Sequence, residues 1–128
     1  MIGPLRLTTT GVVPLTNVSE NAAGALVIQT RLASGTGVTW ALRKRLTGTA
    51  PGTSAPGVTA VADDAAPRCV FRNALLETTV DSVTAVTATP APQIHSVICD
   101  GCDVLLEVLS VTGNGVLLVE LAPITGGT

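Results

Sequence analysis

A cysteine pair in the C-terminal third of the chain has the spacing most suggestive of chemistry. The segment "HSVICDGC" places Cys99 and Cys102 in a CxxC pattern, and His95, the single histidine of the chain, stands four residues upstream. Cysteine and histidine are the usual protein ligands of zinc, and CxxC is also the pattern of thiol–disulfide centres. A structural zinc site needs four ligands, and the only further cysteine is Cys69. On one strand, His95 and Cys99 would lie roughly 13 Å apart, which is too far to share an ion.

The two residues between the cysteines favour a turn over a metal or redox centre. Asp100-Gly101 is a strong two-residue hairpin signal, because both central positions of such a turn need positive φ. We expect Cys99 and Cys102 to lie opposite one another across this turn, with both thiols toward the core, where free cysteine packs as a small hydrophobic residue. A cross-strand disulfide, formed after release into an oxidising medium, is the alternative. A thioredoxin-like centre is disfavoured, since a strand and not a helix follows the motif. The expected core face carries His95, Val97, Cys99, Cys102, Val104, Leu106 and Val108.

Two further polar groups have weaker claims to chemistry. His95 has no nucleophile-elbow motif such as GxSxG elsewhere in the chain, so we predict no catalytic role for it. Asp63-Asp64 lies in a loop without EF-hand spacing, and we expect both carboxylates to be solvated and without a metal. The sequence therefore predicts no enzyme, no catalytic residue, no cofactor and no metal ligand.

The one basic cluster, Arg43-Lys44-Arg45, ends a predicted strand. Strand alternation places Arg43 and Arg45 on the polar face, and Lys44 on the face of Trp40, where its ammonium group can extend to solvent. We interpret the cluster as a solvated strand end, with contact to an acidic partner surface as the alternative. Phosphate binding is less favoured because no glycine-rich anion site accompanies the cluster.

Alternating apolar residues and closely spaced turn signals predict an all-β chain. The expected strands cover 24–33, 38–46, 67–72, 78–88, 93–99, 103–111 and 116–122, and hairpins join 24–33 to 38–46 and connect the last three strands. Residues 47–67 form a long Pro/Gly-rich loop with one short strand at 57–62, and 73–77 form a single helical turn. We expect one domain over 1–128, a β-sandwich or jelly roll of about seven to nine mostly antiparallel strands, with a small barrel less favoured.

The composition is poor in charge and in aromatic side chains. Charged residues make up 12% of the 128 residues, aromatic residues 2%, and the net charge is −2. Nucleic-acid binding is not expected without a basic face, and no apolar run is long enough to cross a membrane. The N-terminus does not resemble a signal peptide, so we expect synthesis in a cytoplasm. A surface so short of charge suits a subunit that neighbours cover, more than a free monomer.

Two segments carry a family resemblance. The strand–turn–strand pattern "ALVIQTRLASGTGVTWALRKRLTG" and the closing "DVLLEVLSVTGNGVLLVELAP" resemble small β-sandwich virion proteins of bacteriophages, such as head decoration proteins and fibre or tail modules. The resemblance implies a non-enzymatic subunit that binds the outside of a capsid and stabilises it, located in the virion after synthesis in the host cytoplasm. It also implies the major capsid protein or other virion proteins as partners, and a homo-oligomer, with a trimer favoured. No functional residues follow from it.

The sequence leaves two alternatives open. One is a phage tail, fibre or head–tail connector module, and the other is an adhesin-like or carbohydrate-binding sandwich. Sugar binding is disfavoured because Trp40 is expected in the core and the chain has no tyrosine. The segments 1–15 and 123–128 are candidate docking arms, since the first is apolar and could add a strand to a neighbour.

Overall fold

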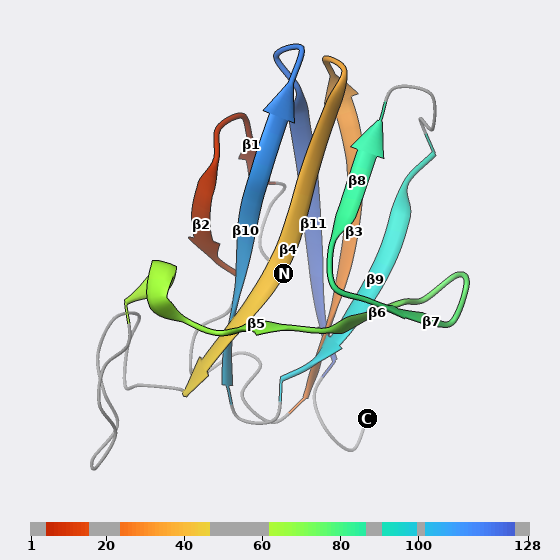
Figure 1. Ribbon diagram of the computed structural model, residues 1–128. Coiled ribbons are helices and arrows are strands. Elements are labelled where there is room, and N and C mark those ends of the chain that lie inside the picture. The colour runs from red at the N-terminus through yellow and green to blue at the C-terminus, as the bar shows by residue number, and fades with distance from the viewer. Residues whose placement is uncertain (1–4, 16–23, 47–61, 87–90, 100–101, 125–128) are drawn as a thin grey trace.

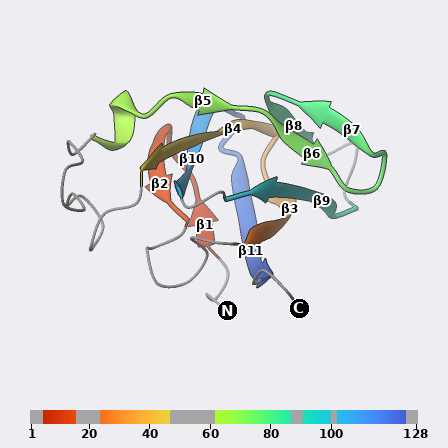
Figure 2. The same cartoon turned by 90° about the horizontal axis from the view of Figure 1, so that it is seen from below.

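The computed structural model describes residues 5–15, 24–46, 62–86, 91–99 and 102–124. These residues form two antiparallel sheets packed face to face, with no α-helix among them (Figures 1 and 2). The predicted all-β sandwich is confirmed, although the described residues contain eleven strands instead of seven to nine. The difference arises because several of the strands are only two to four residues long.

Each sheet combines long central strands with short outer ones. Sheet A has the order β1-β11-β3-β9-β6-β7, and sheet B has the order β2-β10-β4-β5, with β8 also paired to β4. A 3₁₀ turn, η1 (Asp63–Ala65), precedes β5. The strand bounds are β1 Leu5–Leu7, β2 Gly11–Pro14, β3 Ala25–Ser34, β4 Gly37–Leu46, β5 Arg68–Cys69, β6 Phe71–Asn73, β7 Thr78–Val80, β8 Val83–Val86, β9 Gln93–Ile98, β10 Cys102–Thr112 and β11 Val116–Ile124.

Strands from the first half of the chain pair in reverse order with strands from the second half, as if the chain were folded once into a long hairpin. β2 pairs with β10, β3 with β9, β4 with β8, and β6 with β7, all antiparallel. Further pairing of β10 with β4 and of β9 with β6 joins these strand pairs into two sheets. This is the wiring of a jelly roll, one of the two architectures that we expected. β11 and β1 extend sheet A beyond β3.

The predicted hairpins between the long strands are wrong. β3 and β4 lie in opposite sheets, as do β9 and β10, and β10 and β11, so each connection crosses the sandwich. The local turn chemistry is nevertheless as expected at 112–115, where Gly113 and Asn114 both have φ of 57° and the Gly115 N–H donates to the Thr112 carbonyl at 3.1 Å. Turn residues set the reversal of the chain, whereas the pairing of the flanking strands depends on distant partners.

Two of these crossings pack against each other at one end of the sandwich, and this contact explains their glycines. A Cβ at Gly35, where φ is 85°, would lie 2.4 Å from the Gly115 Cα, and a Cβ at Gly115 would lie 2.5 Å from the Gly37 carbonyl oxygen. The Thr36 N–H also donates to the Thr112 carbonyl at 3.2 Å. The backbones are therefore in direct contact, and side chains at Gly35 and Gly115 would separate them.

The remaining differences are local. The expected strands at 67–72 and 78–88 are each divided, the first into β5 and β6 and the second into β7 and β8, and the two parts of each lie in different sheets. The expected helical turn at 73–77 is confirmed as the connection between β6 and β7, where the Glu77 N–H donates to the Asn73 carbonyl four residues earlier at 2.8 Å. Within the expected docking arm at 1–15, β1 and β2 pair with β11 and β10 of the same chain. Of the arm at 123–128, the first two residues end β11, and the others lie outside the described residues, as do most of the expected strand at 57–62 and the turn at 100–101.

Aromatic rings form the centre of the core between the sheets. Trp40 is completely buried, as predicted, and its ring stacks on Phe71 with centroids 5.2 Å apart. The His95 ring meets Trp40 edge-on at 5.3 Å and Phe71 at 5.5 Å. Aliphatic side chains from the inner faces of both sheets complete the core, among them Leu26, Ile28, Leu42, Val104, Leu106, Leu117 and Val119.

Candidate interaction surfaces

The CxxC cysteines lie at a crossing between the sheets. Cys99 is fully buried and belongs to the core, whereas Cys102 is half-buried at the start of β10. The Cys102 N–H donates to the Cys99 carbonyl at 2.8 Å, so the chain turns tightly here, yet the two residues are not a cross-strand pair. The expected core position is thus confirmed for Cys99, and the expected hairpin is not. No disulfide bond joins Cys69, Cys99 or Cys102 in this structure.

The expected orientation of His95 is confirmed. Its side chain is 1% exposed, and its Nδ1 has no hydrogen-bond partner among the described residues. Burial lowers the pKa of the imidazole, because the charged form is poorly solvated between Trp40 and Phe71. The neutral ring therefore serves here as a packing element of the core.

The other predicted polar groups do not converge. Among the described residues, no three His, Cys, Asp or Glu side chains gather closely enough to hold a metal ion. Burial raises the pKa of the Cys69 thiol, which disfavours the thiolate that metals bind. Asp64 is exposed, as expected for a solvated loop residue, and its main-chain carbonyl accepts a hydrogen bond from the Arg43 side chain at 3.2 Å.

On the outer face of sheet B, Arg43 connects β4 to β10 and to the segment that contains η1. Its Nε and Nη2 donate to the two carboxylate oxygens of Glu107 at 3.0 Å each, and its Nη1 donates to the carbonyls of Asp64 and Ala66. The Arg68 Nε meets the same carboxylate at 3.0 Å. The hydrogen bond from Arg43 lowers the pKa of Glu107. Arg43 is therefore bonded within its own chain and is not the solvated strand end that the sequence suggested.

The other two residues of the basic cluster lie in different environments. Arg45 and Asp103 approach at 3.5 Å with both side chains 5% exposed, so this ion pair is buried on the outer side of sheet B. Lys44 has the register of the Trp40 face, as predicted, and it is half-buried. Only Lys44 thus leaves its charge available for a partner at the rim of the sandwich.

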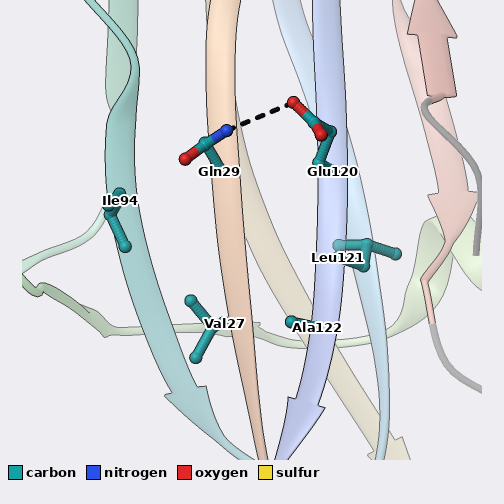
Figure 3. A pocket seen from close by; sticks show the side chains of 6 residues that line it. All are labelled: Val27, Gln29, Ile94, Glu120, Leu121 and Ala122. Carbon is teal, nitrogen blue, oxygen red and sulfur yellow. Dashed lines mark hydrogen bonds between the residues drawn. The ribbon is translucent and has the colours of Figure 1, made fainter. Parts of the chain in front are cut away.

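The outer face of sheet A contains a shallow hollow of about 200 Å³. Figure 3 shows Val27, Ala122 and Ile94 on three neighbouring strands, and the Gln29 Nε2 above them donates to the Glu120 Oε1 at 3.2 Å. An apolar floor with one internally bonded polar pair favours a flat protein partner over a small charged ligand.

A second candidate surface lies where the β6–β7 hairpin leaves the sandwich (Figure 1). We call Leu75, Leu76 and Glu77 the hairpin tip, because they belong to the turn between these strands. The edge hollow beside it has a volume of about 400 Å³. The residues that line the edge hollow are Lys44, Val70, Phe71, Arg72, Thr79, Ser96, Val97 and Ile98.

Sequence reasoning missed both surfaces. The sequence predicted the turn at 73–77 but not the exposure of its two adjacent leucines, although two large apolar residues in a very short connection are a signal of exposure. The edge hollow joins residues from β4, β6 and β9, and their proximity follows from the jelly-roll pairing alone.

Comparisons with known proteins place no further constraint on the site. No family model, no curated protein and no solved structure matches the chain. Within the described residues, no helix has the length and apolar character needed to span a membrane. The functional interpretation therefore depends on the surfaces themselves.

Proposed function

We propose that this chain is a non-enzymatic structural protein of a bacteriophage virion, a head decoration protein that binds the outside of the capsid and stabilises it. The observation that carries the proposal is the outer face of sheet A. Val27 and Ile94 are only half-buried on this face, and no described strand or helix packs over it. A sheet face of this kind gains free energy when a partner covers it.

The composition and the fold give independent support. With 12% charged residues, the chain has few groups whose desolvation would oppose docking of a broad surface. Jelly rolls occur in viral capsid proteins and in lectins, so the fold supports a virion subunit by analogy.

The two aromatic residues favour the virion proposal over a carbohydrate-binding one. Protein sites for sugars commonly present an exposed aromatic ring, and the chain has no tyrosine. Trp40 is 0% exposed and Phe71 is 4% exposed, so neither ring is available for stacking.

Binding to capsids tests the proposal directly. Capsids assembled without this protein should bind it saturably on co-sedimentation, and their thermal disruption should move to higher temperature. Val27→Asp should abolish binding, because it places a carboxylate on the apolar floor, whereas Thr84→Asp on sheet B should bind normally.

The number of copies bound distinguishes the alternatives. A copy number comparable to that of the shell subunits supports decoration, while a few copies at one vertex indicate a tail or connector part. No binding at saturating concentration overturns the proposal, and retention of the protein on a glycan array would favour the carbohydrate-binding alternative.

A further inference from the structure

Exposed apolar side chains concentrate at one edge of the sandwich. Among the described residues, the large hydrophobic side chains that are well exposed are Val70 at 61%, Leu75 at 63%, Leu76 at 72% and Ile98 at 64%. Leu75 and Leu76 form the hairpin tip, and Val70 and Ile98 line the edge hollow. A projecting apolar knob and an apolar recess therefore lie on the same molecule.

The hairpin tip is held in one conformation by hydrogen bonds. The Asn73 Oδ1 accepts from the N–H groups of Leu75 at 3.0 Å and Leu76 at 2.9 Å, and the Glu77 N–H donates to the Asn73 carbonyl at 2.8 Å. These bonds fix the backbone that presents the leucines, so little conformational entropy is lost when a partner binds them.

Glu77 occupies a position that favours glycine. Its φ is 58°, in the left-handed region, where a side chain costs roughly 1 kcal/mol or more. Its carboxylate meets Arg72 at 3.0 Å, but the side chains are 75% and 51% exposed, and such exposed pairs contribute little. A carboxylate at this strained position points to a role in contact with a partner.

The edge hollow has the complementary charge. Lys44 lines it, is half-buried, and forms no salt bridge within the part of the chain that the structure describes. A carboxylate that enters the hollow beside the leucines would meet this ammonium group in a partly desolvated setting, where a charge pair is stronger than at an open surface.

We propose that the hairpin tip of one copy docks into the edge hollow of a second copy of this chain. Leu75 and Leu76 then cover Val70 and Ile98, and Glu77 approaches Lys44. Because the tip and the hollow are different surfaces, the contact is head-to-tail, and it closes into a ring when the rotation between neighbours permits. The contact uses the β6–β7 edge together with Ile98 on the outer face of sheet A, and it shares no residue with the hollow that Val27, Ile94 and Ala122 line. It therefore goes beyond the proposed capsid binding and leaves that hollow free.

The mass of the purified protein in solution is the first test. Light scattering over a range of concentrations should show an oligomer for the native chain. Leu75→Asp with Leu76→Asp, or Ile98→Asp alone, should weaken self-association by about a hundredfold, as expected when buried apolar anchors of an interface are lost. Ser110→Asp adds the same charge to an exposed position of β10 and should leave the mass unchanged. Circular dichroism should show the same folded state for all variants, because the altered side chains are exposed.

Mixing the two kinds of variant tests the head-to-tail arrangement. The tip variant retains an intact hollow and the Ile98→Asp variant retains an intact tip, so their mixture should form a one-to-one heterodimer although neither associates alone. Glu77→Lys and Lys44→Glu should each weaken association, and the two changes combined in one chain should restore part of it.

Two results would overturn the proposal. One is a native chain that stays monomeric at every concentration, and the other is a tip variant that keeps the native oligomeric mass. If the tip variant keeps its mass but no longer binds capsids, the tip contacts the shell instead of a second copy. The capsid proposal would survive that result, so the failures of the two proposals can be distinguished.

Discussion

The outer faces of the two sheets differ in how far other segments of the chain cover them. On sheet B, the segment from η1 to β5 passes over β10 (Figure 2), and the Arg43 side chain donates hydrogen bonds to main-chain carbonyls of this segment. Ala41 and Leu105 are therefore buried even though their side chains point away from the core. On sheet A, Val27 and Ile94 stay half-buried and Ile98 is 64% exposed. One face is closed by the chain itself, and the other is open.

This contrast separates stability from binding. The charges on the outer face of sheet B are paired within the chain, through Arg43 with Glu107 and Arg45 with Asp103. Changes there should therefore lower the free energy of unfolding. Changes on sheet A should affect stability little and partner binding strongly, because the side chains already contact water in the free protein.

The largest effect on stability is expected at the buried ion pair of sheet B. Asp103→Ala leaves the Arg45 guanidinium without this carboxylate, and loss of one member of a buried pair costs about 3–5 kcal/mol. Urea denaturation of this variant should show that decrease, with Arg31→Ala on sheet A as the matched control, expected within about 0.5 kcal/mol of the native chain. Equal decreases in both variants would contradict the contrast between the faces.

Glu107→Gln should have the next largest effect, about 2 kcal/mol, since the carboxylate accepts charge-assisted bonds from Arg43 and Arg68. Arg43 lowers the pKa of this carboxyl below its ordinary 4.5, so its contribution is present above pH 4.5 and is lost as the pH falls through the folded-state pKa. Denaturation midpoints measured between neutral and acid pH should fall less steeply for Glu107→Gln than for the native chain. If the denaturation midpoints of Glu107→Gln fall with acid pH as steeply as those of the native chain, Glu107 does not govern the loss of stability in acid.

His95 should produce a separate loss of stability at higher pH. Burial lowers its pKa below the ordinary 6.5, so the unfolded chain binds a proton that the folded chain does not, and stability decreases as the pH falls below about 6.5. His95→Phe, which keeps an aromatic ring beside Trp40, should flatten the stability profile between pH 6.5 and the onset of the Glu107 effect. If the profile of this variant matches that of the native chain, the imidazole does not titrate with unfolding.

The smallest effect on stability is expected at the open face. Ala122→Asp adds a charge at an exposed position of β11 and should change the free energy of unfolding by about 0.5 kcal/mol or less. The same substitution should strongly reduce capsid binding in co-sedimentation. A destabilisation as large as that of Asp103→Ala would mean that this face is not open in solution.

The sequence correctly predicted features that depend on neighbouring residues, such as strand positions and the side chains that face the core. Alternation located the long strands, assigned Cys99 and His95 to the core, and identified Trp40 as the central large residue. It could not show that β9 and β10 belong to different sheets, because a tight turn is compatible with a hairpin and with a crossing. It also mistook Arg43 for a solvated residue, since the carbonyls and the Glu107 carboxylate that it binds come from segments far away in the chain.

The nested pairing has a consequence for how the chain folds. Gly11 pairs with Val108, and Ala25 pairs with Ile98. The early strands β2 and β3 can therefore pair only after the late strands β10 and β9 have been synthesised. Among the strands that the structure describes, only β6 and β7 pair directly across a short connection. A topology with so many distant pairings folds slowly, and closure of the sandwich has to follow release of nearly the whole chain. During that delay the edges of both sheets are exposed, which makes the interval before closure the period of greatest risk for aggregation.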